Sequence, residues 1–180
     1  MFNYIPMDVD RALVNALRDH PQDVGVQYGA LMALVDVSVN DGNRAYVVKE
    51  DAHTEVVASM RRHLDSWMVQ AAGCCQWVIG NSDLADNKVP VDQLELGLKE
   101  AHVAIVNGTK AHRDNPEVVH QATWALGNMV GSANNQMLIA EGGGVVTTLE
   151  VMAEHVTSEQ VAINRCQVYR RAKRRRREEE

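Results

Sequence analysis

The segment Glu117–Val130 has the clearest alternation of hydrophobic and polar positions in the chain. When its residues are placed 100° apart, as in an α-helix, the apolar side chains form one stripe roughly 100° wide. The stripe consists of Val118, Ala122, Ala125, Leu126 and Met129. Trp124 and Asn128 lie off the stripe, four residues apart on a neighbouring face together with His120 and Gln121. The pattern predicts a core-facing helix with a separate functional face.

The same pattern recurs along the chain. A histidine is followed six residues later by a valine in four segments, and the histidines are 43, 49 and 43 residues apart. The histidines are His20, His63, His112 and His155, and the valines are Val26, Val69, Val118 and Val161. A fixed period of this length predicts a helical solenoid, in which each repeat buries its apolar face against its neighbours. We call each period a cycle.

Periodicity, caps and turn residues predict the helices within each cycle. The expected helices are Asp8–Asp19, Val24–Val39, Asn43–Lys49, Ala52–Arg62, Trp67–Asn81, Asp92–Ala111, Glu117–Val130, Asn134–Ala140, Val145–Glu154 and one from Glu159 onward. The extra residues of the 49-residue interval are expected in Ser82–Val91, and a break at Gly142–Gly144. In the first two helices the expected core residues are Val9, Leu13, Ala16, Leu17, Val26, Ala30, Ala33, Leu34 and Val37.

The second cycle allows two alignments. Counting from Val69 places Cys75 and Ile79 on the functional face. Matching Ile79–Asn81 to Leu126–Asn128 instead places Trp77 and Asn81 there, which repeats the Trp-x-x-x-Asn pair but requires a slip of two residues. Spacing alone leaves both alignments open.

Composition and charge narrow the class of protein. The 180 residues are 46% hydrophobic and 23% charged, as in ordinary soluble proteins. Residues 170–180 hold seven basic and three acidic residues, which leaves 11 basic and 21 acidic residues, a net charge of −10, for the rest. An acidic body disfavours binding to nucleic acid and favours basic partners.

There is no apolar run of 18 residues and no secretory signal pattern at the N-terminus, which disfavours a membrane association. Three cysteines cannot all pair, so we expect a reducing, intracellular and cytoplasmic location.

No residue set predicts catalysis or a cofactor. Adjacent Cys74 and Cys75 lack the spacing of a metal or redox site and are expected to pack between helices. The recurring histidines lie one cycle apart, too far for a shared metal ion, and are expected to meet free carbonyl groups at helix ends. Gly142–Gly144 lacks the spacing of phosphate-binding loops. We therefore predict neither an enzyme nor a metal, cofactor or small-molecule site.

These residues resemble the armadillo-repeat family. The family pattern V-Q-x-x-A-x-W-A-L-x-N-x-x-x-x-x-x-N is matched by Val118–Asn135, apart from Val119 in the glutamine place, and the following E-G-G by Glu141–Gly143. The first cycle matches at Val26-Gln27, Ala30-x-x-Ala33-Leu34 and Asn43-Arg44, and the resemblance covers roughly Asp8–Gln167. It implies an all-α, right-handed solenoid of about four repeats, the first and last incomplete, over residues 1–169, followed by a charged tail or helix end at 170–180.

The resemblance also assigns roles on the functional face. In family members that bind peptides in the concave groove, the tryptophan stacks on aliphatic stems of basic side chains and the asparagine bonds the ligand backbone. These roles fall on Trp124 and Asn128, and Met32 and Asp36 stand at the matching places of the first cycle. The expected partner-binding residues are therefore Trp124, Asn128, Gln121, His120, Met32, Asp36 and, in the slipped alignment, Trp77 and Asn81.

The leading functional prediction is a non-enzymatic scaffold or adaptor that binds a protein or extended peptide, of basic character, in the groove. The alternative is a structural subunit of a larger cytoskeletal or ciliary assembly, held through its terminal helices. Apolar faces at incomplete end repeats also predict self-association. The run Arg170–Arg177 allows three roles. It is of the nuclear-localisation type, which adds a nuclear location as an alternative; it contacts an acidic partner; or it belongs to a charged, exposed helix end paired with Glu178–Glu180.

Overall fold

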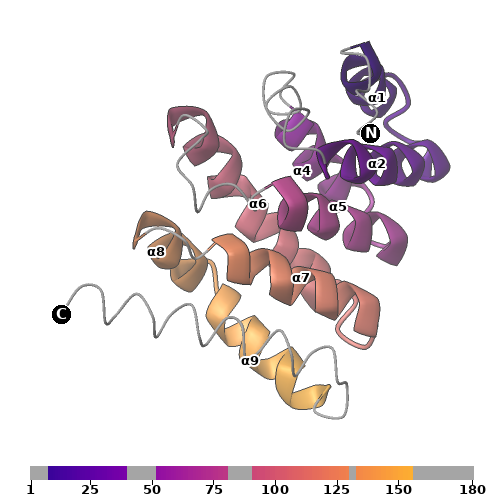
Figure 1. The fold of residues 1–180 in the computed structure, drawn as a ribbon. Coiled ribbons are helices and arrows are strands. Elements are labelled where there is room, and N and C mark those ends of the chain that lie inside the picture. The colour runs from indigo at the N-terminus through magenta and orange to yellow at the C-terminus, as the bar shows by residue number, and fades with distance from the viewer. Residues whose placement is uncertain (1–7, 40–51, 81–90, 130–132, 156–180) are drawn as a thin grey trace.

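The computed structural model describes residues 8–39, 52–80, 91–129 and 133–155, and within these ranges all regular structure is helical (Figure 1). The helices are α1 (Asp8–Asp19), α2 (Val24–Ser38), α4 (Ala52–Arg62), α5 (Trp67–Gly80), α6 (Val91–Ala111), α7 (Pro116–Met129), α8 (Ala133–Glu141) and α9 (Gly144–Glu154). The all-α prediction is therefore confirmed over the described part of the chain. Each of these helices begins and ends within one residue of its expected bounds.

The helices are arranged in two layers. In one layer α2 packs against α5 and α5 against α7; in the other α1 packs against α4, α4 against α6, and α6 against α9. The first three helices of the second layer also pack against the helix that follows each of them in the chain: α1/α2, α4/α5 and α6/α7. Figure 1 shows these pairs succeeding one another down the molecule from the N-terminal end. Neighbours in the chain are thus neighbours in space.

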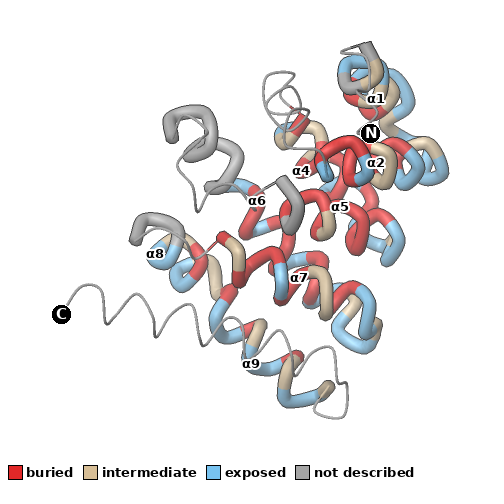
Figure 2. Tube along the Cα trace, in the orientation of Figure 1, coloured by how far each residue is buried: buried red, intermediate tan, exposed pale blue. Residues whose placement is uncertain are grey.

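The core lies between the layers and runs through the length of the stack. The five residues of the apolar stripe in α7 are each at most 4% exposed, as the periodicity predicts. In α2, by contrast, Val26 and Ala33 are only half-buried, although they were expected in the core. The reason is that α2 is the first described helix of its layer, so one of its sides has no described neighbour. Figure 2 shows buried residues in the helices of both layers, in α2, α5 and α7 and also in α4 and α6.

The turns that join the two layers share one pattern of hydrogen bonds. The backbone N–H three residues after each histidine donates to that histidine's carbonyl, at 3.2, 3.0 and 2.9 Å after His20, His63 and His112. The donor residue is also the cap of the next helix: Asp23 Oδ1 accepts from the N–H groups of Gly25 and Val26 at 2.9 and 3.0 Å. Capping residues of this type satisfy backbone N–H groups that a helix start leaves without partners.

A buried glutamine closes the first two turns. Gln27 Nε2 donates to the carbonyl oxygens of Leu17 and His20 at 3.0 and 2.9 Å. Gln70, 43 residues later, makes the same two bonds at 2.8 and 2.9 Å to the carbonyls 10 and 7 residues before it. In the third turn Val119 takes this place and packs in a small cluster with Val151 of α9. An apolar contact to the next helix thus replaces the amide.

The recurring histidines tie each turn to the one before it. The imidazole Nε2–H of His63 donates to the carbonyl of Pro21 at 2.8 Å, and His112 donates to Leu64 at 2.8 Å. His155 donates to Arg113 at 2.6 Å. The prediction that these rings meet carbonyl groups is confirmed for His63, His112 and His155. The carbonyl, however, belongs to the preceding turn, because stacking places the turns one above another.

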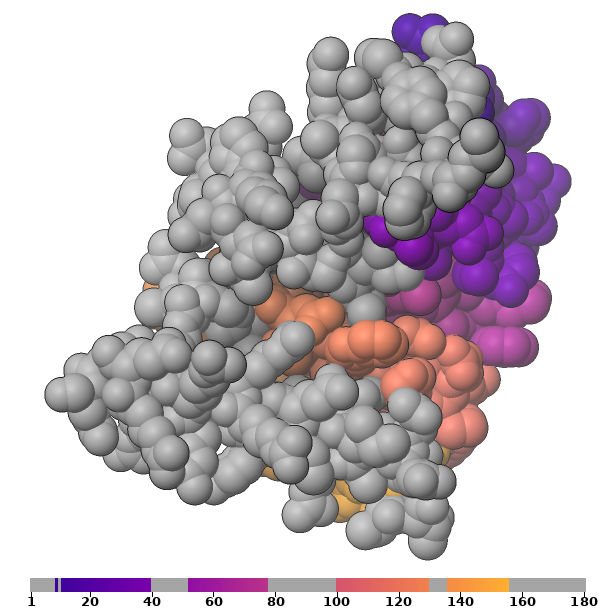
Figure 3. Space-filling model, in the orientation of Figure 1, coloured from indigo at the N-terminus to yellow at the C-terminus, as the bar shows by residue number. Residues whose placement is uncertain are grey.

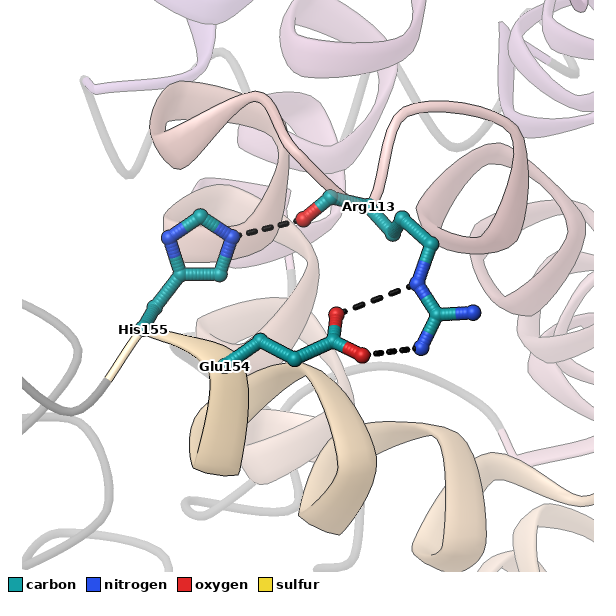
Figure 4. Close-up of polar contacts among 3 residues, drawn as sticks. All are labelled: Arg113, Glu154 and His155. Carbon is teal, nitrogen blue, oxygen red and sulfur yellow. Dashed lines mark hydrogen bonds and ion pairs between the residues drawn. The ribbon is translucent and has the colours of Figure 1, made fainter.

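Exposed ion pairs follow the same succession. Each joins one helix pair to the next: Arg18–Glu55 at 2.9 Å, Arg61–Glu100 at 2.8 Å, and Arg113–Glu154, with Nε to Oε2 at 3.0 Å. Figure 4 shows the last of these, with a second bond from the guanidinium to the same carboxylate and the His155 contact beside it. Pairs at the surface contribute about 0–1 kcal/mol each. They therefore fix orientation more than stability.

The expected break between Gly142 and Gly144 is confirmed. Gly143 has a φ of 76°, in the left-handed region that glycine adopts without strain, and α9 starts directly after it. Several other expectations fall outside the described residues: the helix Asn43–Lys49, most of Ser82–Val91, the helix from Glu159 onward and the charged segment 170–180.

Candidate protein-binding face

The functional face predicted for α7 is the surface-facing side of that helix. His120, Gln121 and Asn128 are half-buried, and Trp124 is 36% exposed. Glu117, one turn before His120, is exposed on the same side. We call these five residues the α7 row. On the face shown in Figure 3, α7 (orange) lies at the surface beside α5 (magenta) and α2 (violet).

The side chains of the α7 row are held by one another. The rings of His120 and Trp124 lie with their centroids 5.8 Å apart and their planes at 43°. Gln121 Nε2 donates to Glu117 Oε1 at 2.9 Å. An aromatic side chain that is already restricted loses less conformational freedom when a partner covers it. Trp124 is therefore partly exposed and already restricted by its contact with His120.

His120 is neutral at neutral pH. Burial lowers the pKa of its imidazole below the ordinary value of 6.5, and the nearby Glu117 carboxylate opposes that shift. A neutral ring beside Trp124 adds no positive charge to this face. The face is therefore left with the negative charge of Glu117.

The first cycle contributes a second row on α2. Met32 is half-buried and packs against the core, and Asp36 is exposed, four residues further along the helix. Tyr28, 37% exposed, stands eight residues after His20, as His120 stands eight after His112. Tyr28 was not predicted as a site residue. The cycle spacing would have identified it, had it been applied to the aromatic residues of the first cycle.

The structure decides between the two alignments of the second cycle. Gln70 repeats the bonds of Gln27 at a spacing of 43 residues, which leaves no slip at that point of the helix. Trp77 is 6% exposed and belongs to the core, so its assignment to the partner-binding face is wrong. It occupies the place of Leu34 and Leu126, fourteen residues after the histidine of its cycle. Asn81, the other residue of that alignment, lies outside the described residues.

Cys75 is the α5 residue at the place of Met32 and Trp124, and it is half-buried. Burial raises the pKa of its thiol, and the carboxylates of Glu117 and Asp36 raise it further. Carboxylates from α2 and α7 thus act together on one group of α5. Asp36 and Glu117 are therefore both near enough to Cys75 to influence its thiol.

The α5 row has smaller side chains than the rows on either side. Ala71, Ala72 and Cys75 stand where α7 has His120, Gln121 and Trp124. Ala71 and Ala72 are 8% and 2% exposed, so they add little accessible surface. The accessible polar and aromatic groups of the face therefore come from α2 and α7, with α5 between them.

The other cysteine of the pair, Cys74, lies in the protein core. Cys74 is fully buried in the core, which raises the pKa of its thiol strongly and agrees with a packing role. Across the described ranges, no group of three or more His, Cys, Asp or Glu residues could hold a metal ion. Likewise, no described helix combines the length and apolar character needed to cross a membrane.

No family model, curated protein or solved structure matches the chain.

Proposed function

We propose that the chain is a right-handed solenoid of about four armadillo-type repeats that binds a protein or an extended peptide without catalysing a reaction. Two features support the repeat architecture: the cycles of the sequence and the turns that recur with the same hydrogen bonds. In this arrangement α2, α5 and α7 are successive helices lining a concave groove, and α1, α4, α6 and α9 form the outer layer.

The observation that carries the binding function is Trp124, which is exposed beside His120 on the side of α7 away from the core. Tryptophan is among the residues most enriched at the energetic centre of interfaces. A large aromatic side chain buries much apolar area with few rotatable bonds, which suits it to anchoring a ligand. Met32 provides a second apolar group at the same place of the first cycle.

Charge supports a basic partner. Asp36 and Glu117 act on the same thiol from two helices, so a ligand lying across α5 would be near both carboxylates. The body of the chain is acidic as a whole. Lysine or arginine side chains on a ligand would gain from both the local and the overall charge, which increases the association rate and selects against acidic competitors.

Side-chain amides give the face a way to recognise an extended backbone. A peptide in an extended conformation has N–H and C=O groups that need partners, and an amide side chain can donate and accept. Asn128 holds the asparagine place of the armadillo pattern, and Gln121 lies nearly two turns before it. These two residues and Trp124 are the proposed contacts on α7.

The test is selection from a random peptide library displayed on phage, with the full chain as bait. We expect enrichment of lysine- and arginine-rich sequences that bind wild type but lose about 2 kcal/mol, roughly thirtyfold in affinity, with Trp124→Ala/Asn128→Ala. Trp67→Ala is the matched control, because Trp67 is 46% exposed at the start of α5 and lies outside the proposed contacts. Selected peptides that bind the folded double variant as tightly as wild type would disprove this site.

The second candidate function is a structural subunit held through its terminal helices. It is favoured by the exposed apolar residues of α9: Val145, Val146 and Leu149, which are 49%, 59% and 63% exposed. An apolar face of this kind marks a contact with another element or another protein. The two candidates differ in which surface binds. Only the groove function predicts that the selected peptides lose affinity with Trp124→Ala/Asn128→Ala.

A further inference from the structure

The start of α5 exposes three large apolar side chains close together in the chain. Leu64, in the turn before the helix, is 40% exposed. Trp67 and Met68, the first two residues of the helix, are 46% and 37% exposed. The three residues are absent from the core clusters of the described part of the chain. We call them the α5 edge.

Helix formation does not account for the residues at the start of α5. At the two corresponding places α7 has Pro116 and Glu117, which favour a helix start, because proline fits the first position and a carboxylate offsets the helix dipole. Trp67 and Met68 supply neither effect. Since Cα–Cβ bonds in a helix tilt toward its N-terminus, both side chains are directed toward the turn that holds Leu64. Large apolar residues gathered at the surface in this way mark a contact with another molecule.

Hydrogen bonds to the neighbouring turns hold the α5 edge in place. The imidazole of His63 donates to the carbonyl of Pro21 in the preceding turn at 2.8 Å. The imidazole of His112, in the following turn, donates to the carbonyl of Leu64 itself at 2.8 Å. The turn before α5 is thus fixed between the other two. A surface that is fixed before a partner arrives loses less conformational freedom on binding.

The charges around the α5 edge are mainly negative. The segments 18–25, 61–68 and 110–117, which contain the three stacked turns, hold five basic and five acidic residues. Three of the bases are already paired with carboxylates outside these segments, in Arg18–Glu55, Arg61–Glu100 and Arg113–Glu154. Two bases, Arg62 and Lys110, therefore remain against five carboxylates. The carboxylates are those of Asp19, Asp23, Asp65, Asp114 and Glu117.

This charge selects among the classes of occupant. An anionic lipid surface or a nucleic acid would be repelled by the carboxylates. A second copy docking through the same edge would bring two sets of carboxylates together. A protein segment with lysine or arginine beside its apolar side chains gains both from covering Trp67 and from attraction to Asp65, which lies in the same turn as Leu64.

We propose that the α5 edge is a second binding site, for a protein segment in which leucine or aromatic side chains stand beside lysine or arginine. The apolar side chains of the partner pack on Leu64, Trp67 and Met68, and its bases lie near Asp65 and Asp114. The site is separate from the α7 row and does not depend on a ligand bound there.

Peptide selection with the groove contacts removed tests the proposal. The full chain carrying Trp124→Ala/Asn128→Ala is the bait for a random peptide library displayed on phage. We expect the selected peptides to combine leucine or aromatic residues with lysine or arginine. They should lose about thirtyfold in affinity when Trp67→Ala/Met68→Ala is added to the bait.

Val146→Ala is the matched control, because Val146 is also an exposed apolar residue, at 59%, but lies on α9. Added to the same bait, it should leave the affinity unchanged. A selection without binders, or peptides that bind equally with and without the side chains of Trp67 and Met68, would overturn the proposal. Peptides that depend on these two residues but lack lysine and arginine would overturn it too.

Asp65→Lys tests the contribution of charge without removing an apolar group. It should weaken binding of a selected peptide by about tenfold, because a nearby attraction becomes a repulsion. Glu150→Lys, at an exposed residue of α9, changes the net charge by the same amount and should weaken binding much less. Circular dichroism checks that both variants stay helical. Equal losses in the two variants would overturn the proposed role of the acidic residues.

Two further measurements separate the other occupants. A dimer of the wild-type chain in analytical ultracentrifugation that is lost with Trp67→Ala/Met68→Ala would assign the α5 edge to a second copy. Co-sedimentation with phosphatidylserine vesicles that is lost with the same substitutions would assign it to a membrane surface. Either result would overturn the proposal. Failure at the α5 edge, with success of the earlier selection on the wild-type chain, would leave the binding function of the α7 row standing.

Discussion

Trp77 and Trp124 lie in two neighbouring helices, α5 and α7, yet their environments are opposite. Trp77 is 6% exposed and packs in the core; Trp124 is 36% exposed and pairs with a surface histidine. The two helices pack against each other and follow turns of the same construction. What differs is the position within the cycle: Trp77 stands fourteen residues after its histidine and Trp124 twelve. In a helix two residues correspond to 200°, which carries a side chain from the core to the surface.

The comparison shows that residue type is a poor guide to function in a repeat of this kind. A tryptophan at the core place packs as Leu34 and Leu126 do, whereas at the outer place it is partly exposed and is the contact that we propose for a partner. Cys75 and Met32 share the outer place and are less prominent residues, but they line the same face. Position relative to the turn therefore predicts accessibility better than the identity of the residue.

The largest expected effect comes from a charge at the core place of α7. Leu126 is 4% exposed, so Leu126→Asp buries a carboxylate without a partner and should cost several kcal/mol, enough to unfold the stack. Thermal unfolding followed by circular dichroism measures this. Trp124→Asp, two residues away at the outer place, should unfold near the wild-type temperature. Similar unfolding temperatures for the two aspartate variants would contradict the assignment of core and outer places.

The second largest effect is the difference between the two tryptophans in how much replacement by alanine lowers the free energy of unfolding. Trp77→Ala leaves a cavity between α5 and its neighbours and should lower the free energy of unfolding by about 3–5 kcal/mol. Trp124→Ala removes a side chain that is partly in water and should cost about 1 kcal/mol or less. Urea denaturation of both variants gives the comparison directly. If Trp124→Ala is the more destabilised of the two variants, the assignment of Trp77 to the core and Trp124 to the surface is wrong.

A smaller effect is expected from the charge that α2 adds to the face. Asp36→Asn should weaken binding of a selected basic peptide several-fold at low ionic strength and reduce the dependence of affinity on salt, because an exposed attraction is screened. Titration calorimetry at two salt concentrations measures both. Asp65→Asn is the control, since Asp65 is exposed in the turn before α5. An equal loss in the two variants would mean that only the net charge matters.

The smallest effect concerns His120. Burial lowers its pKa in the folded chain, so between that lowered value and about 6.5 the unfolded chain binds more protons, and stability rises with pH. The stability is therefore lost as pH falls below about 6.5. Replacing the residue, as in His120→Gln, should flatten this part of the profile of unfolding free energy against pH. A steeper profile in the variant would show that the shift has the opposite sign.

The local sequence pattern was sufficient to predict the bounds of the described helices and the buried side of α7. The helix bounds agree within one residue, and the apolar stripe of α7 is buried as expected, because caps, glycine breaks and the 3.6-residue period act over a few neighbouring residues. The placement of Trp124, Gln121, His120 and Asn128 off the buried stripe followed from the same period. Asp36 and Met32 were located by applying the cycle spacing to the first repeat.

Tertiary packing decided the rest, because it joins residues about 40 or more positions apart. The histidines bond carbonyls of the preceding turn, 42 and 48 residues away, and no local pattern specifies that partner. The register of α5 was ambiguous until the Gln70 bonds and the burial of Trp77 resolved it. The combined action of Asp36 and Glu117 on Cys75 likewise exists only because α2, α5 and α7 stack side by side. The sequence alone determined which side of each helix is apolar. The stacking of the helices determined which of these apolar sides is covered by another helix.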